Sequence, residues 1–347
     1  ERGLESIFRR GPSGRWNRME VAGVSKNRKY ALLIAAGAIL FAWFIFGWDG
    51  LPRQEEEHIR QISYLYRSNS VEETQQAAKQ GIEQAAKDYK CEITATAFDP
   101  AITAKEQKKL IEKEVENGAE AILIEPLDDK KVAQELKKVG KQVPIVQINS
   151  WIRDEAAKDI ERVHVDYYKM GEELARKVHK DVGSGGRILL LKSDMNYADM
   201  EEACLGVKDY LKEQNAIVEE YSMTAAEQKW AGTVPDIMKR TDVSAIITFG
   251  TIQLELCGKI KKEGLALGDA RVYGIGKSNQ IISYLEEGKI SAIGVSSEYS
   301  AGYLSTTKAL GIDLRDTGRE REIDFSVIDG ESIYTTENQR LLFPFVQ

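Results

Sequence analysis

Residues 117–148 read NGAEAILIEPLDDKKVAQELKKVGKQVPIVQI, and this stretch decides the fold class. Its segment 121–124 is wholly apolar, which predicts a strand buried on both faces. A helix is predicted over 129–139, where Gly140 ends it, and a second apolar strand over 143–148. Buried strands that alternate with covering helices are the unit of a parallel sheet with helices on both faces.

The same alternation extends in both directions along the chain. Before this stretch, the sequence predicts strands over 61–67 and 91–98 and helices over 71–89 and 104–117. After it, the predicted strands are 163–165, 187–191, 217–221, 245–248, 272–275 and 290–295. The predicted helices there are 168–180, 200–214, 228–240, 254–263, 279–287 and 300–310, and 323–328 and 331–334 are predicted to be extended. Because crossovers between parallel strands are right-handed, the predicted fold class is α/β, with two doubly wound parallel-sheet lobes.

An apolar run without a charged residue precedes this region, at residues 31–48 (ALLIAAGAILFAWFIFGW). As a helix it would be roughly 27 Å long, which matches the hydrocarbon thickness of a bilayer. The basic segment 1–29 predicts a cytoplasmic N-terminus. We therefore predict one transmembrane helix over 30–48, an acidic linker over 49–59 and an extracytoplasmic globular part, attached to the cell membrane by a single pass.

Two features of the N-terminal region leave alternatives open. The run is longer than the apolar core of a signal peptide and lacks a small-residue cleavage site, so an uncleaved signal-anchor is preferred over a signal peptide cleaved at an atypical site. Met19 opens a short basic segment, which makes residues 1–18 a candidate for a wrongly assigned start. N-terminal sequencing of the native protein tests both points.

Charge and composition narrow the function classes. The net charge is −7, and the part after residue 29 is more negative still, which argues against nucleic acid as a partner. The three cysteines and three histidines lack the spacing of a disulfide framework or a metal site. Residues 274–278 resemble the end of a phosphate-binding loop, but Arg271 stands where its first glycine is required. We predict no cofactor, no metal and no catalytic activity.

Several motifs, in order along residues 60–346, together resemble the type I periplasmic sugar-binding proteins of the ribose-binding and LacI-like group. Residues 117–132 resemble the signature G-x-x-A-I-I-I-x-P-x-D, and residues 143–150 resemble the strand I-P-V-I-x-x-D. Residues 163–175 resemble the first crossover, with Asp166 and Gly171 in place. Later strands and the second crossover are matched by residues 242–250, 272–278 and 285–305.

The resemblance implies two lobes joined by three crossovers, with a ligand trapped between them by hinge closure. The N-terminal lobe would comprise 60–164 with 298–323, and the C-terminal lobe 165–297 with 324–347. It also implies a partner, which is the permease of an ABC importer or a sensor kinase or chemoreceptor. A LacI-type repressor shares the core but needs a helix-turn-helix where this sequence has its apolar run.

The sequence departs from the sugar clamp of this group at several positions. The paired Asp-Arg of one strand end reads Asn149-Ser150, and the Asn-Asp of a later strand reads Gly250-Thr251. Gly276 replaces a further Asp. Planar groups at these positions pair with vicinal hydroxyls, and their loss removes that recognition. A polar ligand other than a simple pentose or hexose, and a role through a protein partner alone, therefore both stay open.

The remaining candidates for ligand binding lie where predicted strands end, because ligands of open α/β sheets bind beyond the carboxyl ends of the strands. Trp151 is either a stacking platform or a cap on a lobe edge, and Trp230 either faces the cleft or packs on a helix. Asp166 either meets ligand or bonds only backbone amides of the hinge, and Lys277 either meets an anionic ligand or is solvated. The full candidate set is Ser68, Asn69, Asn149, Trp151, Asp166, Asn196, Tyr197, Trp230, Thr251, Lys277 and Ser297.

The sequence thus favours a membrane-anchored extracytoplasmic protein that captures a small polar, carbohydrate-like ligand for an ABC importer. The alternative is a ligand-sensing ectodomain that reports to a sensor histidine kinase.

Overall fold

The computed structural model describes residues 30, 33–39, 41–42, 58–68, 72–194, 196–228, 234–312 and 323–343. Within the chain, Ile59–Gln347 forms one compact unit, which contains all the strands named below. The predicted basic segment 1–29 and most of the predicted linker lie outside the described residues.

The prediction of a membrane span over 30–48 is contradicted. Among the residues that the structure describes, no helix combines the length and the apolar character that a bilayer crossing requires. In the predicted span, residues 30, 33–39 and 41–42 are helical and exposed, and the others lie outside the described residues. The predicted single-pass location in the cell membrane was therefore wrong.

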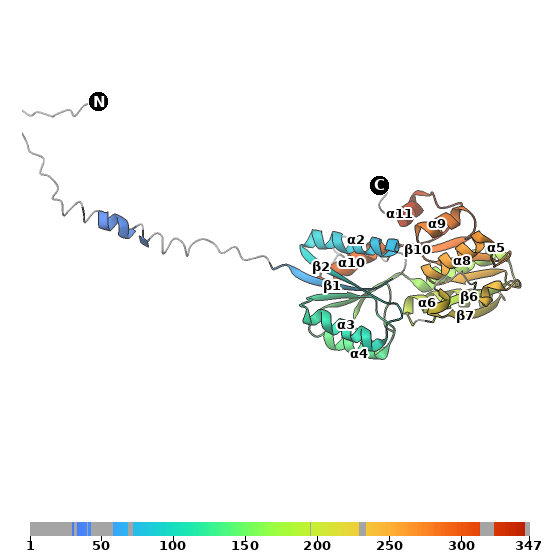
Figure 1. The fold of residues 1–347 in the computed structure, drawn as a ribbon, viewed down its shortest axis with the longest axis horizontal. Helices are drawn as coiled ribbons and strands as arrows, with labels where there is room; N and C mark the ends of the chain where they lie inside the picture. The colour runs from blue at the N-terminus through green and yellow to red at the C-terminus, as the bar shows by residue number, and fades with distance from the viewer. Residues whose placement is uncertain are drawn as a thin grey trace, which may run out of the picture. The chain divides into compact units, whose positions relative to one another are not determined.

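The first sheet has five parallel strands in the order β2-β1-β3-β4-β5 (Figure 1). These strands are β1 (Arg60–Arg67), β2 (Cys91–Phe98), β3 (Ala121–Ile124), β4 (Ile145–Ile148) and β5 (Glu161–Val163). Helices α2 (Glu72–Tyr89) and α10 (Glu298–Ala309) lie on one face of this sheet, and α3 (Ala104–Glu116) and α4 (Lys130–Val139) on the other.

The second sheet has six strands in the order β11-β10-β9-β8-β6-β7, parallel except that β11 runs antiparallel to β10. The strands are β6 (Arg187–Ser193), β7 (Ile217–Met223), β8 (Ala245–Thr248), β9 (Arg271–Ile275), β10 (Ala292–Ser296) and β11 (Phe325–Asp329). The helices around it are α5 (Tyr167–Val182), α6 (Ala198–Glu213), α7 (Ala225–Gln228), α8 (Thr251–Glu263), α9 (Asn279–Glu286) and α11 (Thr336–Leu342). Short 3-10 turns, η1 (Glu155–Ala157) and η2 (Asp236–Lys239), occur in the connections.

Apolar strands are buried on both faces because the side chains of successive residues pack into the hydrophobic cores on opposite sides of the sheet. In β6, Ile188 and Leu190 pack with α5 and α6, whereas Leu189 and Leu191 pack with α8 and α9. Side chains of a strand point alternately to its two faces, so a strand covered on both sides needs apolar residues throughout. The predicted α/β fold class is confirmed by this arrangement.

Two local predictions were wrong. The predicted helix 228–240 is not formed in its described part, because Pro235, which cannot donate a backbone hydrogen bond, stands at the start of η2. Residues 331–334, predicted to be extended, form turns. They are followed by α11, whose cap Thr335 accepts a hydrogen bond from the backbone N–H of Asn338.

Helix α10 and strand β11 pack against different sheets. Helix α10 packs against α2 and against strands β3, β4 and β5 of the first sheet, although β10 before it belongs to the second. Strand β11 then returns to pair with β10. The lobe boundaries given above stay a prediction.

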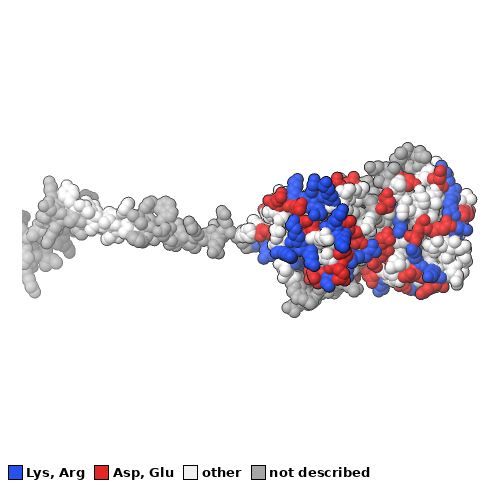
Figure 2. Space-filling model, turned by 90° about the horizontal axis from the view of Figure 1, so that it is seen from below, with Lys and Arg blue, Asp and Glu red and all other residues white. Residues whose placement is uncertain are grey.

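The outer face of α3 and α4 is rich in lysine. Figure 2 shows basic side chains gathered over this part of the first lobe. The exposed lysines are Lys105, Lys109, Lys113, Lys130, Lys131, Lys137, Lys138 and Lys141. The buried carboxylate of Glu135 pairs with Lys108 and Lys138 at 3.1 and 2.9 Å. Burial opposes the charged form of Glu135, but hydrogen bonds from these two lysines outweigh it and lower its pKa.

Candidate functional site

A cavity of about 180 Å³ lies between the two sheets, at the carboxyl ends of their strands. Residues at the ends of β1, β3 and β4 line one side, and residues at the ends of β6, β8, β9 and β10 line the other. This is where an open parallel sheet presents its ligand site. The polar and aromatic lining residues from the first sheet are Tyr64, Arg67, Glu125 and Asn149. Those from the second lobe and the crossovers include Tyr167, Ser193, Tyr197, Asp199, Gln228, Phe249, Thr251, Gln253, Lys277, Ser296 and Glu298.

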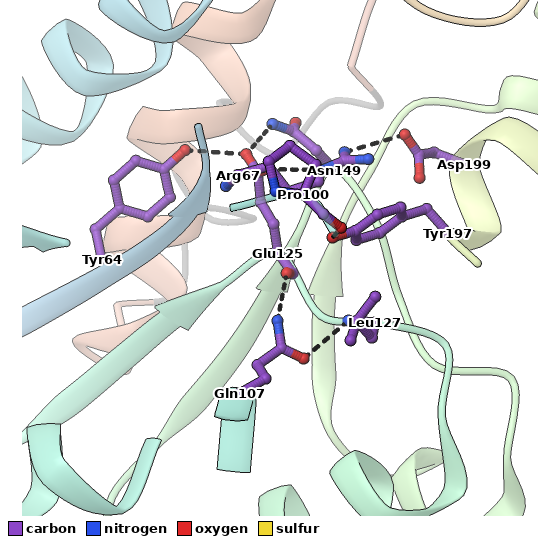
Figure 3. A network of polar contacts seen from close by, with 9 residues as sticks. All are labelled: Tyr64, Arg67, Pro100, Gln107, Glu125, Leu127, Asn149, Tyr197 and Asp199. Atoms are coloured by element: carbon purple, nitrogen blue, oxygen red, sulfur yellow. Dashed lines mark hydrogen bonds and ion pairs between the residues drawn. The ribbon is translucent and has the colours of Figure 1, made fainter. Parts of the chain in front are cut away.

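The carboxylate of Glu125 is the centre of a hydrogen-bond network (Figure 3). Its Oε1 accepts hydrogen bonds from the Tyr64 hydroxyl and from Nδ2 of Asn149, both at 3.1 Å. Its Oε2 accepts from the backbone N–H of Arg67 at 3.2 Å and from Nε of Arg67 at 2.9 Å. Four donors therefore converge on one carboxylate, and they fix both Arg67 and Asn149 at the edge of the cavity.

Arg67 connects the two lobes. One of its terminal nitrogens forms an ion pair of 3.1 Å with Oδ2 of Asp199, which lies in the first turn of α6. The guanidinium also lies 4.3 Å from the ring centroid of Tyr197, whose hydroxyl donates to the carbonyl of Pro100 at 2.9 Å. Burial opposes the charge of Arg67, but the carboxylates of Asp199 and Glu125 raise its pKa above the ordinary arginine value.

Gln107 holds the loop that carries Glu125. Its side chain is fully buried, donates to the backbone carbonyl of Glu125 at 3.2 Å and accepts from the backbone N–H of Leu127 at 3.0 Å (Figure 3). A single amide therefore satisfies both polar backbone groups of the buried loop, which an aliphatic residue of the same size would leave unpaired.

Within the described part of the chain, two carboxylate oxygens at the cavity are buried without a hydrogen-bond partner, namely Oδ1 of Asp199 and Oε2 of Glu298. Glu298 lies in the first turn of α10. Burial raises the pKa of Glu298 to about 7, with Lys277 acting in the opposite direction and Glu125 adding to the rise. The Lys277 ammonium, for its part, donates to the backbone carbonyl of Leu341 in α11 at 2.9 Å.

A chain of amides completes the wall on the second lobe. Gln253 donates through Nε2 to Oε1 of Gln228 at 2.8 Å. Gln228 in turn donates to the hydroxyl of Ser193 at 3.2 Å and to the backbone carbonyl of Met223 at 2.9 Å.

Four of the predicted site residues line the cavity: Asn149, Tyr197, Thr251 and Lys277. Asn149 has φ = 61°, a left-handed conformation that asparagine tolerates better than most residues. Asn69 and Trp230 lie outside the described residues. The other five, Ser68, Trp151, Asp166, Asn196 and Ser297, do not line it.

Asp166 and Ser297 cap helices. The carboxylate of Asp166 accepts from the backbone N–H of Lys169 at 2.9 Å, at the start of α5. The Ser297 hydroxyl accepts from the backbone N–H of Ser300 at 3.4 Å, at the start of α10. Both residues follow crossovers between the lobes, and their side chains satisfy helix N-termini that otherwise lack partners. Asp166 bonds a backbone amide and does not line the cavity, and its role toward a ligand stays a prediction.

Ser68 and Asn196 also lie off the cavity. Ser68 is exposed, and its backbone N–H donates to the carbonyl of Phe98 at 2.7 Å, which extends the pairing of β1 with β2. The side chain of Asn196 donates to the backbone carbonyl of Asp128, and the backbone N–H of Asp128 donates back to the Asn196 carbonyl at 3.1 Å. Asn196 therefore joins the lobes beside the cavity.

Trp151 packs within the first lobe. Its ring is buried, lies 4.5 Å from the His164 ring and is covered by Arg162 at 5.5 Å. The chain turns away from the cavity after Asn149, because the backbone N–H of Ile152 bonds back to the side chain of Gln147 at 2.9 Å. Trp151 therefore does not line the cavity, and the choice between a stacking platform and a cap on a lobe edge stays a prediction.

Trp151→Phe is expected to leave the affinity for a cavity ligand within twofold while lowering the free energy of unfolding by about 1–2 kcal/mol, because it removes only buried packing. Calorimetric titration and urea unfolding measure the two quantities separately. A tenfold loss of affinity in a folded Trp151→Phe variant would contradict the placement of this ring.

The charged cavity residues that sequence reasoning missed are Arg67, Glu125, Asp199 and Glu298. Arg67 ends β1 and Glu125 directly follows β3, so the strand-end rule points to both. Asp199 and Glu298 each lie in the first turn of a helix, where acidic residues are common for local electrostatic reasons alone.

Comparison with known proteins places this geometry in a family. Residues 64–312 match the model of the periplasmic binding protein domain. No curated protein matches the sequence at a significant level.

Solved structures share the fold at low sequence identity. A carbohydrate transporter solute-binding protein from Agrobacterium radiobacter, in complex with D-arabinose, is 17% identical, with a TM-score of 0.71 over 83% of this chain and 100% of that one. GanP, a glucose-galactose binding protein from Geobacillus stearothermophilus, is 14% identical, with a TM-score of 0.67 over 80% and 100%. A chain of the XylFII-LytSN complex is 15% identical, with a TM-score of 0.65 over 79% of this chain and 99% of that one.

Proposed function

This chain belongs to the periplasmic binding protein domain family, and on that premise we propose that it captures a small, polyhydroxylated, sugar-like ligand between its lobes for an ABC importer. The family consists of solute-binding proteins and not of enzymes. Similar folds have been solved with D-arabinose and as a glucose-galactose binding protein, which supports a sugar-like ligand.

The observation that carries the proposal is the chemistry of the cavity wall. The unpaired carboxylate oxygens of Asp199 and Glu298 are acceptors for ligand hydroxyl groups. The aromatic rings of Tyr167, Tyr197 and Phe249 offer apolar surface to the C–H groups of a sugar ring. Buried acceptors that lack a partner cost free energy, and a ligand that donates to them recovers it. The small cavity favours a monosaccharide over a longer saccharide.

The contacts across the cavity support capture by lobe closure. Arg67 of the first lobe pairs with Asp199 of the second beside the ligand space. A ligand that touches both lobes favours the closed form only by as much as it binds that form better than the open one.

Asp199→Asn is expected to weaken ligand binding about tenfold or more, because a carboxylate acceptor becomes an amide and Arg67 loses one of its carboxylate partners. A thermal-shift screen of the full chain against D-arabinose, D-glucose, D-galactose and related sugars identifies the ligand, since ligands that bind only the folded state raise the melting temperature. Calorimetric titration then gives the affinity ratio.

Asp209→Asn is the matched control, because Asp209 is exposed on the same helix and does not line the cavity. The control is expected to retain the parent affinity within twofold. Absence of a shift with every sugar, or equal affinities for the Asp199→Asn variant and the parent, would contradict solute capture in this cavity.

A second candidate function is reporting ligand to a sensor protein such as a histidine kinase. Its support is the likeness to XylFII, which was solved in complex with a second protein, LytSN. The neighbouring genes discriminate: a permease and an ATPase favour transport, whereas a kinase and a response regulator favour sensing.

A further inference from the structure

We infer that the ligand is a cation, namely a small polyhydroxylated amine of the amino-sugar class, whose ammonium group is recognised by Asp199 and Glu298. This inference rests on the proposed function, since it specifies the ligand class of the same cavity. The hydrogen-bond and ion-pair partners of the charged side chains that line the cavity support it.

Both cationic side chains that line the described cavity already have partners within the protein. The Arg67 guanidinium pairs with Oε2 of Glu125 at 2.9 Å and with Oδ2 of Asp199 at 3.1 Å. The Lys277 side chain is buried, and its ammonium donates to the Leu341 carbonyl at 2.9 Å. An anionic ligand would have to compete with these contacts, so the predicted role of Lys277 toward an anion finds no support in its geometry.

The carboxylates are only partly satisfied. Glu125 accepts four hydrogen bonds and has no capacity left for a ligand. Asp199 is paired through Oδ2 alone, and its Oδ1 is buried without a partner, as is Oε2 of Glu298. The described lining thus carries three carboxylates against two cations, and the excess negative charge lies on the groups that lack partners.

A neutral sugar would satisfy the hydrogen-bonding needs of these cavity carboxylates but not their charge. A hydroxyl group supplies the missing hydrogen bond but brings no counter-charge to the ionised carboxylates, and burying a charge without a counter-charge is unfavourable. An ammonium group supplies up to three donors together with the compensating charge, and charge-assisted hydrogen bonds are roughly twice as strong as neutral ones. The hydroxyl groups and ring of the same ligand suit the aromatic part of the wall.

The protonation of Glu298 gives this inference a distinctive pH dependence. The titratable groups that face it are Lys277, Glu125, Tyr64 and Tyr167. Burial raises its pKa to about 7, against the opposing effect of Lys277, so the carboxyl group is mostly protonated at pH 5.5 and half ionised at pH 7. A cation that needs the ionised form should therefore bind about tenfold more tightly at pH 7 than at pH 5.5.

The test is calorimetric titration of the full chain with matched pairs of ligands, at pH 5.5 and pH 7. The pairs are D-glucosamine with D-glucose and D-galactosamine with D-galactose, and N-acetyl-D-glucosamine serves as the neutral amide. The amines are expected to bind at least tenfold more tightly than their partners at pH 7. Glu298→Gln is expected to remove this preference and the pH dependence, while Glu287→Gln, an exposed control, is expected to change neither.

Each outcome decides the matter. Neutral sugars that bind as tightly as the amines, or an N-acetyl derivative that equals the free amine, would overturn the cationic ligand and leave sugar capture standing. Binding of the amine with an unchanged preference in a folded Glu298→Gln variant would overturn the role of Glu298. Absence of binding by every member of the panel would overturn both this inference and the proposed function.

Discussion

Glu125→Ala is expected to lower the free energy of unfolding by about 3–5 kcal/mol, because it leaves the charge of Arg67 partly unpaired in a buried setting. The carboxylate accepts from the Tyr64 hydroxyl, from Asn149 and twice from Arg67, and all four bonds are lost together. The side chain of Arg67 is only 17% exposed, so water replaces the lost partner poorly. The ion pair between Arg67 and Asp199, at 3.1 Å, would remain.

Urea unfolding of the full chain, followed by far-ultraviolet circular dichroism, measures this loss. Glu116→Ala is the control, because Glu116 is exposed at the end of α3, and surface changes of this kind usually stay within about 0.5 kcal/mol. Glu125→Gln keeps the size of the side chain and loses the charge. It provides a folded variant in which ligand affinity falls as well, since Arg67 and Asn149 are no longer held. A decrease in the free energy of unfolding below about 1 kcal/mol in Glu125→Ala would show that the network around Glu125 contributes little to stability.

The fold was predictable because its determinants are local and periodic. Strands and helices alternate from β1 to β10, except that only the short turn η1 lies between β4 and β5. Each strand that is buried on both faces supplies residues to two cores, as Ile188 and Leu189 do, so its sequence is a nearly continuous apolar run. The helix predicted over 228–240 failed because the prediction did not weigh Pro235.

The site was less predictable because its members converge from distant positions. Arg67 meets Glu125 and Asp199, which are 58 and 132 residues further along the chain. Each of these residues alone resembles an ordinary polar residue at a strand end or in the first turn of a helix. Trp151 illustrates the converse: it is large and directly follows the Asn149 loop, yet one hydrogen bond from the Ile152 backbone to Gln147 directs it away from the cavity.

Gly81→Ala and Gly206→Ala are each expected to lower the free energy of unfolding by about 2 kcal/mol, because each adds a methyl group where two helix backbones touch. A Cβ at Gly81 in α2 would lie 2.0 Å from the carbonyl oxygen of Tyr299 in α10. A Cβ at Gly206 in α6 would lie 2.0 Å from the carbonyl oxygen of Tyr168 in α5. Backbone atoms, unlike side chains, cannot avoid the clash with the new Cβ by changing rotamer, so the two helices must move apart. Overpacking costs up to about 3 kcal/mol, and the higher helix propensity of alanine returns about 1 kcal/mol.

Within each helix pair, the partner helix also has a glycine that lies against the backbone of the first helix. A Cβ at Gly302 in α10 would lie 2.1 Å from the carbonyl of Ala78, and one at Gly171 in α5 would lie 2.1 Å from the carbonyl of Ala203. Each lobe therefore contains two helices in contact through a glycine on either side. In both pairs one helix, α5 or α10, directly follows a crossover between the lobes. This geometry gives a structural reason for Gly171 in the motif of the first crossover.

The two substitutions lie in different helix pairs and their nearest neighbours are different residues, so their effects should add. The double variant Gly81→Ala with Gly206→Ala is expected to lose about 4 kcal/mol in urea unfolding, the sum of the single losses. Glu83→Ala is the control, because Glu83 is exposed on the same helix as Gly81 and should change stability by no more than about 0.5 kcal/mol. Alanine at either glycine without loss of stability would mean that the helix pair can separate freely, and would remove close packing as the reason for these glycines.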